Sequence, residues 1–263
     1  IVYAPSTHAP KPSASGPTWR GYYDIKRGDT LGKIARKLDV SVADLVRWNR
    51  VRNNIIKAGD VLVYDKQGQQ PAPRSVGRPT KGKLVGARYL GKGDGYRLRF
   101  PKNAYGIPRV NTLIRTCAKR VKDAFPGTAD ILVGDISRPT GGHFPPHKSH
   151  QSGRDADIGY YLAGNIQNKT MYRVNGSHVD HQKNWTLMKC LLEEERIVRV
   201  YMDTGIQKAM VKFLIKKEII DPALATRLFE AFGGRKGRGL IRHAPLHDTH
   251  IHVRLACTPS EKG

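Results

Sequence analysis

The chain is organised around residues 149–157, which read Ser-His-Gln-Ser-Gly-Arg-Asp-Ala-Asp. His150 and Asp157 lie seven positions apart, and Gly153 between them permits a turn back toward the same face. From Asp155 onward polar and apolar residues alternate, which is typical of a strand with one buried face. We therefore expect His150 and Asp157 to project toward one point, the first from a turn and the second from a strand.

A second stretch, near the C-terminus, has a complementary pattern. Residues 247–252 read His-Asp-Thr-His-Ile-His, and apolar residues continue to Cys257. In a strand, residues two positions apart point to the same face, so His250 and His252 share one face while Ile251 turns to the other. The sequence predicts that this strand faces the residue 149–157 segment.

His150, Asp157 and His252 together form a donor set that suits one zinc ion. Catalytic zinc is bound by three protein ligands, with the fourth tetrahedral corner left for water. The ion lowers the pKa of that water to about 7, which makes hydroxide available at neutral pH. We expect one Zn2+ per chain, held by these three residues, and hydrolysis by attack of zinc-bound water.

The two stretches together resemble the zinc peptidases of the lysostaphin, D-Ala-D-Ala peptidase and hedgehog-like superfamily, whose signature is His-x6-Asp plus His-x-His. Within it, the chain is similar to the penicillin-insensitive murein endopeptidase family. The matching residues are Gly134–Ser137, Gly141-Gly142, His147–Gln151, Gly153, Asp155, Asp157-Ile158, His247, His250–Leu255 and Cys257. The resemblance implies a metallopeptidase that cuts the D-alanyl–meso-diaminopimelyl cross-link of peptidoglycan, in the periplasm or after secretion.

Four further polar residues lie inside the matching motifs. His250 shares the face of the ligands, so it either donates a hydrogen bond to the developing oxyanion or supports a ligand. His247 is the candidate general base, although zinc-bound hydroxide can also form without a base. His147 either contacts substrate or supports a ligand. Arg254 shares the parity of His252 and either binds a substrate carboxylate or lies exposed at the strand end.

Residues 22–65 have the predicted order β-α-α-β and resemble a LysM module. The matching residues are Tyr23, Gly28–Leu31, Ile34-Ala35, Val40-Ser41, Asp44-Leu45, Asn49, Ile55-Ile56, Gly59-Asp60 and Leu62-Val63. The resemblance implies binding of N-acetylglucosamine-containing glycan in a shallow groove. The groove residues would include Gly28, Asp29, Thr30 and Ile55. Leu31 and Ile55 are equally consistent with positions in the core.

The composition places the chain into segments. Residues 1–21 are rich in Pro, Ser and Ala and predict a flexible N-terminal segment. Residues 66–83 have almost no apolar content and predict a linker between the LysM module and a peptidase domain over 84–263. In that domain helical periods and short apolar runs mix without a βαβ rhythm. The predicted fold class is α+β, with a central antiparallel sheet in the peptidase domain.

The charge balance is strongly basic. There are 46 Lys and Arg against 22 Asp and Glu, a net charge of +24. Such a surface favours an anionic partner, either nucleic acid, anionic lipid or a wall polymer. No nucleic-acid reader motif is recognisable, so we expect peptidoglycan as partner and no specific nucleic acid. No apolar run approaches the roughly 18 residues of a membrane span. An exported protein is expected to have a signal peptide, which is not present in this sequence.

The three cysteines are Cys117, Cys190 and Cys257, and they lack the Cys-x2-Cys spacing of a thiolate zinc site. In an exported protein one pair can bridge and one thiol is left over. We expect a Cys117–Cys257 bond, which would tie an early helix to the end of the final strand. Three buried, reduced thiols are equally consistent with the sequence.

Three rival functions stay open at this point. One is cleavage of a different bond by a peptidase of the same superfamily, such as a D-Ala-D-Ala or L,D bond. Another is a LysM wall-binding protein without turnover. The third is nucleic-acid binding, which the basic composition alone would permit.

Overall fold

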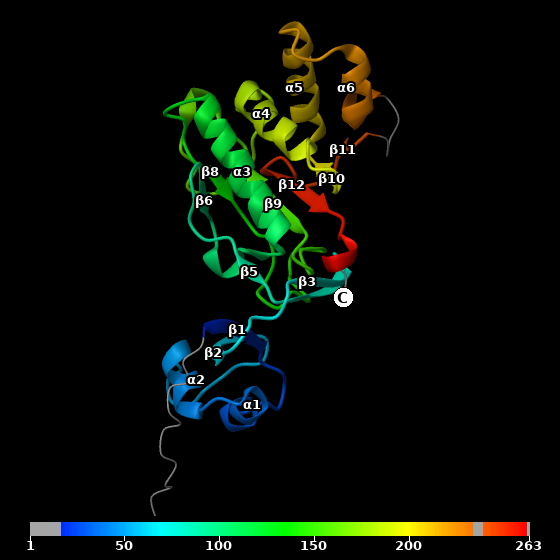
Figure 1. Cartoon of the computed structure of the whole chain (residues 1–263). Coiled ribbons are helices and arrows are strands. Elements are labelled where there is room, and N and C mark those ends of the chain that lie inside the picture. Colours follow the sequence, from blue (N-terminus) through cyan, green and yellow to red (C-terminus); the bar gives the residue numbers. More distant parts are fainter. Residues whose placement is uncertain (1–16, 234–238, 262–263) are drawn as a thin grey trace, which may run out of the picture. The chain divides into compact units, whose positions relative to one another are not determined.

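The computed structural model describes residues 17–233 and 239–261. The chain divides into two compact units, Ile1–Pro71 and Ala72–Gly263 (Figure 1). Each unit has its own cluster of buried hydrophobic residues. Most of the predicted flexible segment, residues 1–16, lies outside the described residues, and from Thr18 the chain is already in a strand. The first strand therefore begins earlier than the sequence predicts.

Unit 1 has the predicted β-α-α-β order. Its elements are β1 (Thr18–Asp24), α1 (Leu31–Leu38), α2 (Val42–Asn49) and β2 (Val61–Gln67). The two strands pair antiparallel, and Gly21 lies opposite Tyr64. A Cβ at Gly21 would come within 2.2 Å of the Tyr64 ring, so this position has no room for a side chain. The side chains of Thr30 and Ser41 cap α1 and α2, which explains why both helices begin where they do.

Unit 2 opens with a β-hairpin that the sequence does not predict. Strand β3 (Arg74–Arg78) pairs antiparallel with β4 (Lys81–Val85). The predicted linker over 66–83 is therefore not a continuous spacer, since β2 continues to Gln67 and only residues 68–73 lie between the two strands β2 and β3. The hairpin has few apolar residues because it is held largely through its backbone, with Leu84 as its buried hydrophobic side chain.

A mixed six-stranded sheet forms the centre of unit 2. Its strands, in spatial order, are β11 (Ile241–Arg242), β10 (Ile197–Tyr201), β12 (His250–Leu255), β9 (Asp155–Gly159), β8 (Ile131–Val133) and β6 (Tyr96–Leu98). The central pairs are antiparallel, whereas the outermost pair on each side is parallel. The α+β prediction is confirmed, and the predicted antiparallel pairing describes the centre of the sheet but not its edges.

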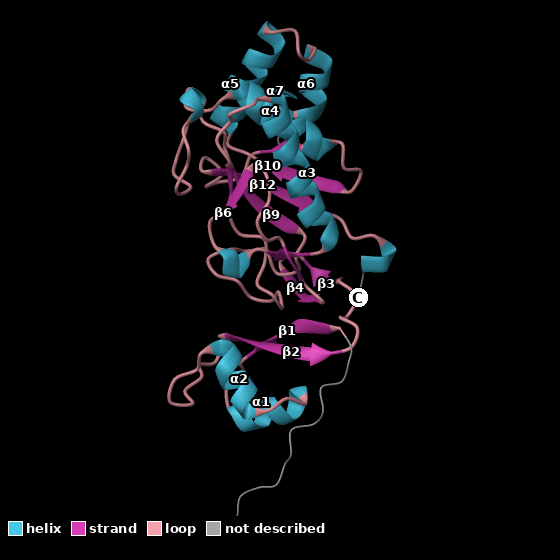
Figure 2. Cartoon of the chain, turned by 60° about the vertical axis from the view of Figure 1, so that its left-hand side comes forward, coloured by secondary structure: helices cyan, strands magenta, loops and turns pink. Residues whose placement is uncertain are grey.

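Helices and short strands complete unit 2 (Figure 2). They are β5 (Arg88–Tyr89), β7 (Tyr105–Gly106), α3 (Pro108–Ala124), α4 (His181–Leu192), α5 (Thr204–Lys216), α6 (Pro222–Leu228) and α7 (Glu230–Gly233). Apolar residues of α3 and α4 form one core with the apolar face of the central strands. The other face of those strands is thereby left for polar side chains.

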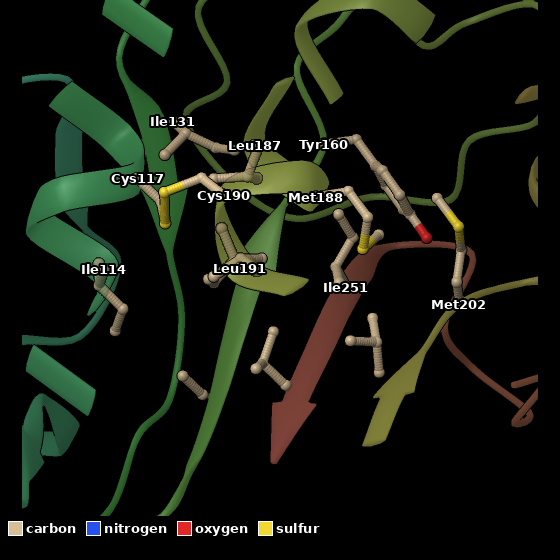
Figure 3. Packing of buried hydrophobic residues seen from close by; sticks show 14 of the residues in the cluster. Ile114, Cys117, Ile131, Tyr160, Leu187, Met188, Cys190, Leu191, Met202 and Ile251 are labelled. Carbon is tan, nitrogen blue, oxygen red and sulfur yellow. A yellow bond between two sulfur atoms is a disulfide. The ribbon is translucent and has the colours of Figure 1, made fainter. Parts of the chain in front are cut away.

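A disulfide joins α3 to α4, between Cys117 and Cys190 (Figure 3). The predicted Cys117–Cys257 bond is wrong. Cys257 is a free, buried thiol beyond the end of β12, and its Sγ lies 3.9 Å from the backbone oxygen of Ser75. The sequence does not reveal that the two helices are neighbours, and this neighbourhood determines the pairing.

Candidate metal centre

The register of β9 and β12 brings the predicted residues onto one face of the sheet. His252 lies opposite Asp157, and Arg254 lies opposite Asp155. The alternate positions of β12, Ile251 and its apolar neighbours, are buried in the core on the other face. The alternation of polar and apolar residues therefore separates a hydrophobic core from a polar site across the thickness of one sheet.

His150 reaches the same face from the loop before β9. Its backbone has a φ of 65°, a left-handed conformation that residues with a Cβ adopt infrequently. The backbone N–H of His150 donates to Asp155 Oδ2 at 3.1 Å, and its Nδ1 lies 3.0 Å from the backbone oxygen of Ile136. Contacts from two other segments therefore fix both the backbone and the ring of His150.

Three donor atoms converge beneath these segments. Asp157 Oδ1 lies 3.2 Å from His150 Nε2 and 3.0 Å from His252 Nδ1. The two ring nitrogens are 3.2 Å from each other. Asp157 is 3% exposed, and among the residues that the structure describes its Oδ1 has no hydrogen-bond partner despite its burial. An unpaired buried carboxylate oxygen is costly unless a cation or a proton compensates it.

In each histidine, the ring nitrogen that points away from Asp157 forms a hydrogen bond, and this bond determines whether the other nitrogen has a free lone pair. The carbonyl of Ile136 can only accept a hydrogen bond, so His150 carries its proton on Nδ1 and leaves the Nε2 lone pair free. His252 Nε2 lies 2.9 Å from Asp155 Oδ1, which leaves the His252 Nδ1 lone pair free. Two neutral imidazole nitrogens and one carboxylate oxygen then face one another. This donor set fits a zinc ion, and each ligand histidine has the outer hydrogen bond typical of zinc sites.

Asp155 supports both histidines and is fully buried. Its Oδ1 also accepts a hydrogen bond from Arg254 Nε at 2.6 Å. Burial alone would raise the pKa of Asp155, but the hydrogen bond with His252 and the surrounding positive charges hold it well below its usual range. Burial opposes a charged His252 as well, yet where no ion is bound Asp155 and Asp157 together raise the pKa of His252 to about 9, so a metal ion at Nδ1 would displace a proton from that nitrogen. The site therefore concentrates negative charge of the kind that a cation neutralises.

His147 lies beside His150, with ring centroids 4.5 Å apart. Its Nε2 is 2.9 Å from Asp135 Oδ2, and Asn103 Nδ2 donates to the other oxygen of Asp135 at 2.6 Å. His147 also forms, with His150 and Asp157, a group whose ligand atoms all lie within 4.8 Å of one another. His147 is therefore close enough either to bind a metal ion or to hold the neighbouring residues in place. The sequence also leaves the role of His147 open.

His250 and His247 line the remaining side of the site. His250 Nε2 is 3.3 Å from Asp157 Oδ1, and its Nδ1 is 2.6 Å from Thr249 Oγ1. His247 precedes β12 and donates from Nδ1 to the backbone oxygen of Pro245 at 2.8 Å. Burial, followed by the nearby His250, lowers the pKa of His247 to about 4. The imidazole of His247 is therefore neutral at pH 7, and the same burial makes it a weaker base than a solvent-exposed histidine.

Arg254 occupies the predicted face, but its Nε is already bonded to Asp155. Two residues that the sequence analysis does not identify complete the surroundings. Tyr201 at the end of β10 packs its ring 5.6 Å from His247 and 5.5 Å from His252. Asn103 fixes Asp135 from a short 3-10 helix. Neither belongs to a motif, and only the pairing of strands and the packing of loops reveal their positions.

The predicted glycan-binding residues lie around one turn and one loop of unit 1. Gly28 has a φ of 84°, which a glycine adopts without strain. Asp29 Oδ2 accepts the Lys26 backbone N–H at 2.7 Å, and Thr30 caps α1. Leu31 is buried in the core, whereas Ile55 is 66% exposed. The structure therefore assigns a core position to Leu31 and leaves Ile55 accessible at the surface.

None of the helices in the described ranges, 17–233 and 239–261, is both long and apolar enough to cross a bilayer.

Comparison with known proteins agrees with this architecture. Residues 75–263 match the family model described as penicillin-insensitive murein endopeptidase, and residues 23–64 match the LysM domain. A penicillin-insensitive murein endopeptidase of Haemophilus influenzae is 32% identical over 190 residues, covering 69% of this chain and 63% of that protein. Its counterpart in Pectobacterium atrosepticum is 28% identical over 197 residues, covering 70% and 65%.

A relative of another kind matches a shorter stretch of the chain. An autolysin of Enterococcus faecalis is 41% identical over 59 residues, which are 22% of this chain and 8% of that protein. The chain spans just under two thirds of the length of the two endopeptidases. With a family match across unit 2 and a LysM domain in unit 1, the chain belongs to the penicillin-insensitive murein endopeptidase family.

Proposed function

We propose that this protein is a zinc endopeptidase that hydrolyses peptide cross-links in peptidoglycan. The observation that carries the proposal is the convergence of His150 Nε2, His252 Nδ1 and the unpaired Asp157 Oδ1 within 3.0–3.2 Å of one another. These three residues would hold the ion. Zinc supplies a water of lowered pKa and polarises the scissile carbonyl.

The neighbouring histidines take the proton-handling roles. We assign His247 as the general base, because its Nδ1 donates to the Pro245 oxygen and the neutral ring then offers the Nε2 lone pair to the proton of the attacking water, which it passes to the leaving amine. His250 Nε2 lies 3.3 Å from Asp157 Oδ1, so a proton on Nε2 points into the site. That N–H then stabilises the negative charge on the carbonyl oxygen. His147 and Arg254 are assigned to substrate contact at the rim of the site, where both side chains are partly exposed.

We assign unit 1 to glycan binding through the Gly28–Thr30 turn and Ile55, which is accessible. The tether raises the local concentration of the peptidase at its substrate. Two further observations support action outside the cytoplasm. The Cys117–Cys190 bond is typical of an oxidising compartment. The net charge of +24 suits an anionic wall.

The bond we assign is the D-alanyl–meso-diaminopimelyl cross-link, on the basis of the family. The proposed reaction acylates no serine, so β-lactams have no nucleophile to trap. Mass spectra of muropeptides after digestion distinguish this bond from D-Ala-D-Ala and L,D bonds, because each cut leaves fragments of different mass.

The decisive experiment measures metal content and hydrolysis in the same protein preparations. The wild type is expected to carry about one zinc per chain and to convert cross-linked muropeptide dimers to monomers in a chelator-sensitive reaction. His150→Ala should lose both the metal and the activity. His143→Ala is the matched control, since His143 is an exposed histidine of the same loop. A metal-free wild type, or binding to peptidoglycan without release of monomers, would contradict the proposal.

A further inference from the structure

The β3–β4 hairpin has two chemically different faces. Ser75 pairs with Leu84, and Gly77 pairs with Gly82, so these residues share one face, which we call the inner face. Ser75 and Leu84 are buried. A Cβ at Gly82 would lie 3.0 Å from Ser152 Cβ and closer still to backbone oxygens, so only glycine permits this approach. The inner face is therefore packed closely onto unit 2.

The backbone of the hairpin is hydrogen-bonded to the loop that carries His150. Leu84 N donates to the oxygen of Thr140 at 2.9 Å, and Gln151 N donates to that of Pro79 at 3.0 Å. Gly142 N lies 3.1 Å from the oxygen of Gly82. Arg154 completes the set with a side-chain hydrogen bond to the oxygen of Gly77. The hairpin is thus held against the loop of residues 138–154, next to the candidate metal centre.

The outer face carries positive charge only. Its charged residues are Arg74, Arg78, Lys81 and Lys83. All four are exposed, and within the described part of the chain none of their side chains forms an ion pair or a hydrogen bond. Residues 74–85 contain no Asp or Glu. These four cations concentrate positive charge on one face of a twelve-residue hairpin, and such a surface attracts anions.

One pair of these cations opposes the stability of the hairpin. Arg78 and Lys81 are direct partners in the register, across the turn of the hairpin. Like charges directly opposite each other on two strands are destabilising, and in residues 17–233 and 239–261 neither of these side chains has a carboxylate partner. An anion bound between them would remove this repulsion. A pair of like charges that lowers the stability of the hairpin is expected where those charges bind a ligand.

We propose that the outer face of the β3–β4 hairpin binds the free carboxylates of peptidoglycan stem peptides. This rests on the proposed function, because it takes peptidoglycan as the substrate. Two features favour this polymer over nucleic acid. The hairpin follows the LysM domain after only residues 68–73, so a strand bound by that domain is presented to the hairpin at high local concentration. The backbone of the hairpin is hydrogen-bonded to the loop of the candidate metal centre, where the peptides of the same glycan strand would be cut.

The test compares two variants with the same change in net charge. The first is Arg74→Gln/Arg78→Gln/Lys81→Gln/Lys83→Gln. The control is Lys208→Gln/Lys212→Gln/Lys216→Gln/Lys217→Gln, which removes four exposed lysines on and just after α5. In both views, α5 lies at the end of unit 2 remote from β3 (Figures 1 and 2). Binding of the full chain to purified sacculi is measured by co-sedimentation in the presence of chelator, so that no bond is cut.

We expect the hairpin variant to bind sacculi about tenfold more weakly at low salt, since each exposed ion pair contributes a small share. The control should bind like the wild type. On sacculi whose carboxylates have been converted to neutral amides, the wild type should fall to the level of the hairpin variant. Equal losses in both variants, or undiminished binding to amidated sacculi, would overturn the proposal. The proposal would also be overturned if a short DNA duplex displaced the wild type from sacculi and if the binding of that duplex were lost in the hairpin variant.

A stability measurement separates binding from folding. Lys81→Gln should leave the thermal midpoint unchanged or raise it at low salt, because it removes the repulsion with Arg78, while it weakens binding to sacculi. A variant that lowers both would make Lys81 a structural residue and refute the proposal. A failure of the hairpin proposal can be distinguished from a failure of the proposed peptidase function. Hydrolysis of soluble dimers by the wild type tests the latter, and binding in chelator does not depend on it.

Discussion

Replacing Asp155 with Asn tests whether one buried carboxylate organises the candidate metal centre. The two oxygens of Asp155 accept three hydrogen bonds, from His252, Arg254 and the backbone of His150. An amide of the same size has only one acceptor oxygen. Whichever way it turns, either the His150 backbone or the His252–Arg254 pair meets an N–H group instead of an acceptor.

The loss at His252 is that of one charge-assisted hydrogen bond, about 1.5–3 kcal/mol. If it is expressed fully in the orientation of the ligand ring, zinc affinity falls roughly 10- to 150-fold. The 10- to 100-fold range typical of residues that support metal ligands overlaps this estimate. The assay is competition for zinc between the metal-stripped protein and a chromophoric chelator, with circular dichroism to verify the fold.

Asp135→Asn provides the matched control. Asp135 is also a nearly buried carboxylate beside the site, but its partners are His147 and Asn103 and not the proposed ligands. Its replacement should change zinc affinity by less than about threefold, since no proposed ligand loses its outer hydrogen bond. If Asp155→Asn binds zinc as tightly as the wild type, or if both variants lose affinity equally, the argument from ligand orientation is refuted.

Further predictions concern other parts of the chain. His247→Ala should lower kcat by about 10²- to 10⁴-fold with zinc content unchanged, as measured on soluble muropeptide dimers; loss of the metal would instead make His247 a ligand. Cys117→Ser/Cys190→Ser should lower the free energy of unfolding in urea by about 4 kcal/mol, because the bond closes a loop across a separation of 73 residues. Leu31→Ala should destabilise unit 1 by about 2–5 kcal/mol, whereas Ile55→Ala should weaken glycan binding and leave its thermal midpoint unchanged. Equal destabilisation by both would place Ile55 in the core.

The sequence predicts the faces of the strands well because side-chain alternation is a local property. His250, His252 and Arg254 share a face in the structure because they are two positions apart along one strand. The outer hydrogen bonds follow less directly. That Asp155 bonds to both His252 and the His150 backbone depends on the register between β9 and β12 and on a left-handed residue in a loop, neither of which a motif specifies.

The predictions that fail concern contacts between distant segments. Cys117 and Cys190 pair because α3 and α4 are neighbours, and helical periodicity does not show which helices meet. The segment of residues 66–83 lacks apolar residues and therefore has the composition of a linker. Its strands form nonetheless, because the backbone is bonded to another loop and glycines permit the approach. Hydrophobic patterning cannot report a structure held in this way.

The close packing of the β3–β4 hairpin restricts where this chain can be re-engineered. At Gly141, on the loop beneath it, an added Cβ would fall 2.3 Å from the oxygen of Gln151 and 2.6 Å from Leu84 N. A chimaera that replaces the LysM module must therefore be spliced within residues 68–73. A splice placed by composition alone, between residue 74 and residue 83, would cut into the β3–β4 hairpin and remove part of unit 2 together with the LysM module.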